Sequence, residues 1–298
     1  MISSRNHSLL FIHLLMVISA ALVSTSFIVG AAITDQLDPA VLTLIRFVIA
    51  SMVFAPLIYY KYGATFSFDL FWRCSVISGC LVVFFWCMFL SLRYTTPLNT
   101  SVIFTLVPSI SWFYAFFLLS EKLTGGKLAA LFCGMVGAIW VIFRGDFSAF
   151  LAMELNKGDL IFLAGGFAIG LYTPLVKLLH RGEPMAVMTF WVLFSGSCWL
   201  FLFSGYKLPG VRWSDIPAGV WIGVCYLAVF TTVFTFFLTQ YSIPFLGSTR
   251  VMAYSYLYPG MVLLIDLGLG HGLPSLSVLP GILIVLTSMV ILQCSECE

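Results

Sequence analysis

The stretch LLFIHLLMVISAALVSTSFIVGAAI, residues 9–33, carries no charged side chain. A helix crosses the hydrocarbon core of a bilayer with about 20 predominantly apolar residues, so this stretch is long enough to span it. The apolar region of a cleaved secretory signal is shorter, about 7–15 residues. We therefore predict that residues 9–33 form a first membrane span that is retained.

Nine further apolar stretches follow, separated by short polar connections, and five spans begin at a proline. Proline suits the first helical turn because its missing N–H group is not needed there. Only 9% of the residues are charged and 61% are hydrophobic, whereas soluble domains carry about 25% charged residues. The sequence predicts an all-α polytopic membrane protein with spans at residues 9–33, 39–60, 70–92, 97–119, 125–143, 159–179, 184–203, 218–241, 244–269 and 274–291; the prolines are Pro39, Pro97, Pro184, Pro244 and Pro274.

Charge and composition exclude several classes of protein. The net charge is +2 and the chain has no basic run, so a nucleic acid is not expected as a partner. The connections are too short for a nucleotide-binding module, and the sequence contains no phosphate-binding loop. Cys294 and Cys297 have C-x-x-C spacing, but no second pair or nearby histidine completes a metal site. We expect neither a metal nor a cofactor.

The chain contains an internal repeat. RYTTP at residues 93–97 is matched by QYSIP at residues 240–244, and each precedes a span interrupted by another proline, Pro108 or Pro259. We infer two halves of five spans each, residues 1–145 and 156–298. Residues 146–155 link them, either as a short interfacial helix or as a plain loop.

An odd number of spans per half means that the halves enter the membrane from opposite sides. Such inverted-topology repeats are typical of secondary transporters. Seven Lys and Arg residues fall in the connections on the side of the N-terminus and five on the other side. Because positive charge favours the cytoplasmic side, we predict that both termini are cytoplasmic.

Several short motifs resemble those of a known family. PAVLTLIRF at residues 39–47 resembles the second-helix pattern of the drug/metabolite transporter superfamily, in its EamA-type branch, and STSF at residues 24–27 resembles its first-helix signature. The resemblance implies ten transmembrane helices as two inverted five-helix repeats around a central cavity, exporting or exchanging small metabolites across the cell inner membrane. The other matching positions are Pro108, residues 120–123, Gly134, Gly137, Tyr172, Lys177 and Pro259.

Two arginines within spans are the first candidates for substrate binding. An arginine inside a membrane is energetically costly and usually faces a cavity or a partner. Arg46 either meets an anionic substrate group, such as a carboxylate, or is a snorkelling or structural arginine that caps helix carbonyl groups. Arg250 belongs either to the substrate site or to a polar seam of helix packing. Tyr254 follows Arg250 by four residues and so shares its helix face. Pro259 leaves a backbone carbonyl free one turn earlier, which can open a helix onto a cavity.

Polar and aromatic positions in the matching spans are further candidates, with packing between helices or lipid contact as the alternative for each. Asp266 is a candidate for proton coupling, because a buried carboxylate can exchange protons near neutral pH; simple exposure at the end of its span is the alternative. The remaining substrate-binding candidates are Ser26, Trp86, Asn99, Pro108 and Tyr172.

These observations predict a transporter that moves a small amphipathic metabolite, an amino acid or related compound, by alternating access and in the direction of export. The expected partners are this small molecule and the lipid bilayer, and a homodimer is left open. The alternative is a polytopic membrane enzyme acting on a lipid. Only the pair His180-Arg181 and His271 come near a motif for such an enzyme.

Overall fold

The chain is all-helical wherever the structure describes it. The computed structural model describes residues 9–63, 66–120, 125–143, 146, 156–246, 248–270 and 276–294, and no strand occurs among them. Within these residues eight helices are long and apolar enough to cross a membrane, and two shorter apolar helices, Leu128–Ile142 and Leu276–Ile291, accompany them. The fold class predicted from the sequence is confirmed.

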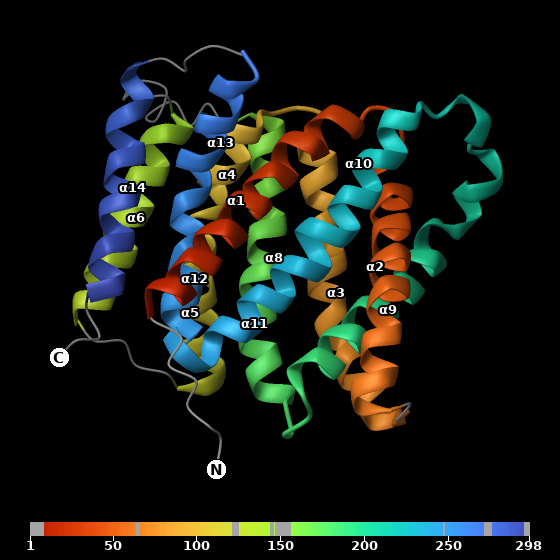
Figure 1. Ribbon diagram of the computed structural model, residues 1–298. Coiled ribbons are helices and arrows are strands. Elements are labelled where there is room, and N and C mark those ends of the chain that lie inside the picture. Colours follow the sequence, from red (N-terminus) through yellow and green to blue (C-terminus); the bar gives the residue numbers. More distant parts are fainter. Residues whose placement is uncertain are drawn as a thin grey trace.

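The fourth span of the first part is broken in two before Pro108. The helices of this part are α1 (Leu9–Ile33), α2 (Pro39–Tyr62), α3 (Phe68–Ser91), α4 (Pro97–Phe104), α5 (Val107–Leu119) and α6 (Gly125–Ile142). They run across the molecule with helices of the second part between them, such as α8 (Lys157–Leu179) between α3 and α5 (Figure 1).

The second part has more interruptions. A π-helical segment lies between α10 and α11, and a 3-10 segment lies between α12 and α13. The elements are α8 (Lys157–Leu179), α9 (Met185–Ser204), η1 (Gly205–Gly210), η2 (Trp213–Asp215), α10 (Ala218–Ala228), η3 (Val229–Phe234), α11 (Thr235–Leu246), α12 (Ser248–Ala253), η4 (Tyr254–Leu257), α13 (Tyr258–Gly268), η5 (Leu276–Val278) and α14 (Leu279–Cys294).

Side-chain caps fix where several helices begin. The Asp38 carboxylate accepts a hydrogen bond from the backbone N–H of Ala40 at 2.9 Å, directly before α2. Asn156 accepts from the N–H of Gly158 at 2.9 Å and caps α8 in the same way. Such caps satisfy N–H groups that have no partner within the helix.

Some of the predicted boundaries were wrong. Pro244 does not open the ninth span but lies in the last turn of α11, and the next helix starts at Ser248. A proline so near a helix end removes one backbone donor without ending the helix, and membrane helices tolerate this. Residues 240–244 are therefore helical, whereas residues 93–96 lie in a connection and Pro97 opens α4. Pro108 and Pro259 do correspond, each in the second position of its helix.

Other expectations fall outside the described residues. These include the linker beyond Asp146, Pro274 and Cys297.

The pair α6 and α14 packs at one edge of the molecule, and α2 and α9 pack at the opposite edge (Figure 1). A β-carbon built on Gly137 of α6 would lie only 2.8 Å from the carbonyl oxygen of Gly281 in α14. Glycine at both positions lets the two backbones touch, which is how many membrane helices pack.

An ion-pair cluster around the buried Arg73 ties the start of α3 to the connection between α8 and α9. Arg73 is 6% exposed; its Nε donates to the Asp69 carboxylate at 2.9 Å, and its other nitrogens donate to the Leu179 carbonyl and to Glu183. The hydrogen bond from Arg73 lowers the pKa of Glu183 from 4.5 to about 2. The cluster thus depends on an ionised Glu183.

We expect Glu183→Gln to destabilise the protein at neutral pH by about 1–3 kcal/mol, because it weakens a charged contact to a buried donor. Since the folded-state pKa of about 2 lies below the ordinary value of 4.5, the contribution of Glu183 is full above pH 4.5 and disappears as the pH falls towards 2. Thermal unfolding of both proteins in detergent at pH 7 and pH 3 measures this. An equal difference at both pH values would contradict the prediction.

Candidate functional site

A central cavity of about 180 Å³ lies between the two parts of the chain. Its lining comes from α1, α2, α3, α4 and α8 and from the segment η3 to α13. Much of the wall is apolar or aromatic, and hydroxyl groups are scattered over it. Among the described residues that line the cavity, Arg46 is the one charged side chain; the hydroxyl groups belong to Ser19, Ser26, Tyr172, Thr231, Thr235, Thr239, Tyr254, Ser255 and Tyr258.

Arg46 is held by α2 inside the protein and is 1% exposed. Its Nε donates to the hydroxyl of Thr232 at 3.0 Å, and its Nη2 donates to the hydroxyl of Thr231 at 3.1 Å. The guanidinium carbon lies 4.2 Å from the ring centre of Phe85, an attractive cation–π contact. Nη1 has no hydrogen-bond partner. No carboxylate of the described chain lies within 4.0 Å of this guanidinium.

The π-helical segment η3 brings the two threonines to Arg46. Thr231 and Thr232 are adjacent in sequence, yet both reach the same guanidinium. Both hydroxyls also donate to the carbonyl oxygen of Leu227, each at 2.9 Å. Single-turn π segments often mark functional sites. The sequence reasoning missed these threonines, although two adjacent polar residues within an apolar span are a signal that could have revealed them.

Five aromatic side chains, which we call the aromatic cluster, bound the cavity on one side. They come from five helices, and their ring centres are between 5.3 and 6.3 Å apart in the contacting pairs. The members are Phe27, Phe84, Phe104, Phe162 and Tyr258.

The aromatic cluster lies towards the side where α4 and α8 begin. Phe162 is completely buried and lies five residues after the start of α8, or about 8 Å along the helix. Beyond it, Asp159 accepts hydrogen bonds from the hydroxyl of Thr95 and from the amide of Asn99, the latter at 3.4 Å. Asp159 is only 4% exposed. The aromatic cluster, followed by the hydrogen bonds of Asp159, therefore separates the cavity from the side where α4 and α8 begin.

Four of the residues singled out from the sequence meet in the cavity: Ser26, Arg46, Tyr172 and Tyr254. Tyr254 also exchanges a hydrogen bond with Nδ1 of His13 on α1. A role in binding substrate stays a prediction for each of them.

The other candidates do not line the cavity. Trp86 is 43% exposed on the outer surface of α3, and Asn99 contacts Asp159 instead. Arg250 lies on α12, one turn before Tyr254. The remaining three lie in the first turns of α5 and α13 and near the end of α13: Pro108, Pro259 and Asp266.

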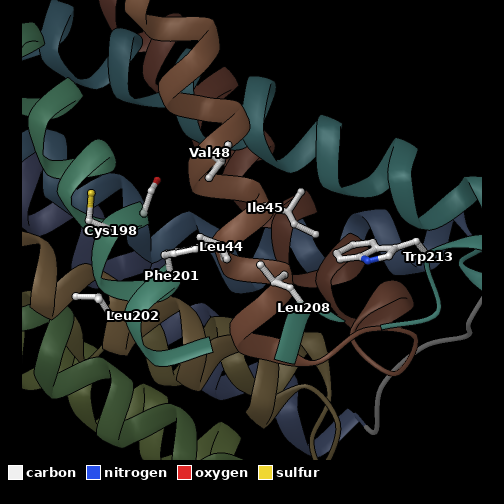
Figure 2. A pocket seen from close by; sticks show the side chains of 9 residues that line it. Leu44, Ile45, Val48, Cys198, Phe201, Leu202, Leu208 and Trp213 are labelled. Carbon is white, nitrogen blue, oxygen red and sulfur yellow. The ribbon is translucent and has the colours of Figure 1, made fainter. Parts of the chain in front are cut away.

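A second hollow, the outer groove, lies between α2, α9 and the η1–η2 segment. Figure 2 shows Ile45 and Val48 on one side, Phe201 and Leu202 on another, and Trp213 at one end. Its volume is about 610 Å³, and its described lining carries no acidic, basic or histidine side chain. Phe201 and Leu202 are 60% and 71% exposed, so the groove opens onto an apolar surface. This composition suits a lipid chain as a neighbour.

Many long apolar helices surround an internal cavity, an arrangement typical of a multi-pass membrane transporter. The chain belongs to the EamA-like transporter family, which matches residues 10–143 and 156–293. Its ten transmembrane helices are accordingly arranged as two inverted five-helix repeats, as the resemblance in the sequence implied.

Two similar proteins are also named as transporters. The uncharacterized transporter YyaM of Bacillus subtilis is 26% identical over 66% of this chain, and the match spans 65% of that relative's length. An uncharacterized transporter of Archaeoglobus fulgidus is 26% identical over 83% of this chain and 85% of its own. A solved crystal structure, 18% identical, superimposes with a TM-score of 0.66 over 93% of this chain and 94% of the other, a likeness of fold alone.

Proposed function

We propose that this protein is a secondary transporter that exports a small amphipathic metabolite, an amino acid or related compound, across the inner membrane. The observation that carries the proposal is the central cavity. It has an apolar wall, scattered hydroxyl groups and one cation, and it draws its lining from both matched parts of the chain. A concave, mostly apolar site with a few polar groups is the usual form of a small-molecule site.

The arrangement of the two repeats supports alternating access as the mechanism. Substrate sites of inverted-repeat transporters lie between the repeats, which move against each other around the site. If both termini are cytoplasmic, α4 and α8 begin on the outer side, and the aromatic cluster with Asp159 closes that side. The cavity is then loaded from the cytoplasm and released outwards when these contacts separate.

Counterflow in proteoliposomes tests this proposal. Vesicles are loaded with one member of a panel of unlabelled amino acids and related carboxylates, and entry of the same labelled compound is measured. We expect transient accumulation with the protein and none in empty vesicles. Ser26→Phe places a large ring in the cavity and should block this accumulation. Phe117→Ala, on the outer surface of α5, should leave it unchanged.

Absence of counterflow across the whole panel, with protein shown to be folded and inserted, would contradict the proposal. Conversion of a labelled lipid by the same vesicles would support the alternative of a membrane enzyme.

A further inference from the structure

We infer that the substrate is an anion, with one carboxylate bound by Nη1 of Arg46, an apolar body, and no ammonium group to balance the charge. This inference rests on the proposed function, because it takes the central cavity as the site of transport. It narrows the class of amino acids and related compounds to carboxylates with a net negative charge.

The charge balance of the cavity is the first argument. Arg46 carries the one charge among the described lining residues, and no described carboxylate neutralises it. Two basic residues elsewhere in the described chain show the contrast: Arg73 has Asp69 and Glu183 as acidic partners, and Lys207 has Asp38 at 2.9 Å. A buried charge without a counter-ion is unfavourable, so an anion entering the cavity gains the neutralisation that the protein itself does not provide.

The hydrogen bonds of Arg46 are the second argument. The two threonines and the ring of Phe85 fix the orientation of the guanidinium. Nη1 is left with no partner. A guanidinium held in this way presents its remaining N–H groups to a carboxylate, for which its geometry is well matched.

Access to Nη1 requires movement of the cavity wall, because Nη1 has almost no exposed surface in this conformation. Phe85 lies over the guanidinium and also lines the cavity, so a shift of this ring would expose the unpaired donor. Contact with the anion is therefore expected in a conformation that the ligand itself helps to stabilise.

The wall of the cavity defines the rest of the substrate. Phe84, Phe85, Met88, Phe104 and Phe236 are apolar surfaces for an apolar body. The volume of about 180 Å³ is slightly larger than a protein cavity of about 150 Å³ that holds benzene. A single ring or a short branched chain thus fits. An ammonium group would find hydroxyl groups and rings here, but no described carboxylate.

The test uses four compounds that share a phenyl body: 3-phenylpropanoate, phenylalanine, 2-phenylethylamine and 3-phenylpropanamide. They are an anion, a zwitterion, a cation and a neutral amide. Binding to the purified full chain is measured by isothermal titration calorimetry, and transport of the same compounds is measured by counterflow in proteoliposomes. We expect 3-phenylpropanoate to bind about tenfold or more tightly than each of the other three, the gain typical of a charge-assisted hydrogen bond.

Substitutions at Arg46 test whether the preference for 3-phenylpropanoate depends on this residue. Arg46→Gln should remove it, and Arg46→Lys should keep it in part. Arg93→Gln is the matched control, because Arg93 donates to the backbone carbonyls of Thr34 and Leu37 away from the cavity and should leave the order of the compounds unchanged. If Arg46→Gln does not fold, the order in which the parent protein binds the four compounds still tests whether the substrate is an anion.

The outcomes separate this inference from the proposed function. Counterflow of the amine, the amide or phenylalanine at least as fast as that of 3-phenylpropanoate would overturn the inference and leave a transporter. Tight binding of 3-phenylpropanoate that depends on Arg46, without counterflow of any compound, would support the anion site and contradict transport. An order of binding that Arg46→Gln leaves unchanged would overturn the role of Arg46.

Discussion

The variant Arg46→Leu is expected to lose transport by at least about a hundredfold and yet to be more stable than the parent without ligand, by about 1–3 kcal/mol. The two effects have one cause. A desolvated guanidinium without a counter-ion destabilises the empty protein, and the same unneutralised charge binds the anion.

The neighbours of Arg46 do not need it for their own hydrogen bonds. Thr231 and Thr232 each donate to the Leu227 carbonyl whether or not Arg46 is present. Its other close contact is with the ring of Phe85, against which a leucine packs well. Removing Arg46 therefore leaves no new unsatisfied donor, although the shorter side chain leaves some space that limits the gain.

Thermal unfolding in detergent and counterflow in proteoliposomes measure the two effects. Arg73→Leu is the matched control, because Arg73 is also a buried arginine on a membrane helix but has two acidic partners. We expect it to destabilise the protein by about 1–3 kcal/mol, because it removes the hydrogen bonds to Glu183 and to the Leu179 carbonyl. A similar loss of stability in Arg46→Leu would show that Arg46 stabilises the fold. This was the alternative interpretation of the sequence, in which Arg46 is a structural arginine that caps helix carbonyl groups.

Much of the fold can be predicted from the sequence because a membrane span needs a long apolar run. The end of α1 at Ile33 was predicted to the residue, and the break at Pro108 is present. The prediction failed at Pro244, where proline was taken as a helix start. Proline restricts the start and the end of a helix differently, and hydropathy does not distinguish the two when apolar residues continue on both sides.

The site could be predicted less well. Arg46 was found because a charge stands out in an apolar span, Ser26 and Tyr172 because they occupy matching positions in the two halves, and Tyr254 because it follows Arg250 by one helical turn. Thr231 and Thr232 reach Arg46 from the π-helical segment. A π-helical segment leaves little trace in an apolar sequence, so contacts between spans far apart in the chain were not predictable.

The second large effect is expected where α6 and α14 touch. Gly137→Ala should destabilise the protein by about 1–3 kcal/mol, the effect of overpacking an interface. The added β-carbon would lie 2.8 Å from the carbonyl oxygen of Gly281 and 3.0 Å from side-chain carbons of Ile284 and Val285. A backbone oxygen cannot rotate away as a side chain can, so the two helices must separate.

Gly79→Ala is the matched control for this prediction. Gly79 lies within α3, and a β-carbon built on it would have no atom within 4 Å apart from its chain neighbours and the backbone of its own helix. Alanine is favoured over glycine inside a helix by about 1 kcal/mol, so this variant should be slightly more stable than the parent. Equal thermal stability of the two alanine variants would contradict the close contact between α6 and α14.

The reciprocal variant adds a test of the contact itself. Gly281→Ala would place a β-carbon 2.8 Å from the carbonyl oxygen of Gly137 and 2.6 Å from a methyl group of Val141. Because either substitution pushes the same helices apart, the second should cost less once the first is present. We therefore expect the double variant to be destabilised by less than the sum of the single variants. Simple additivity would mean that the two glycines act at independent contacts.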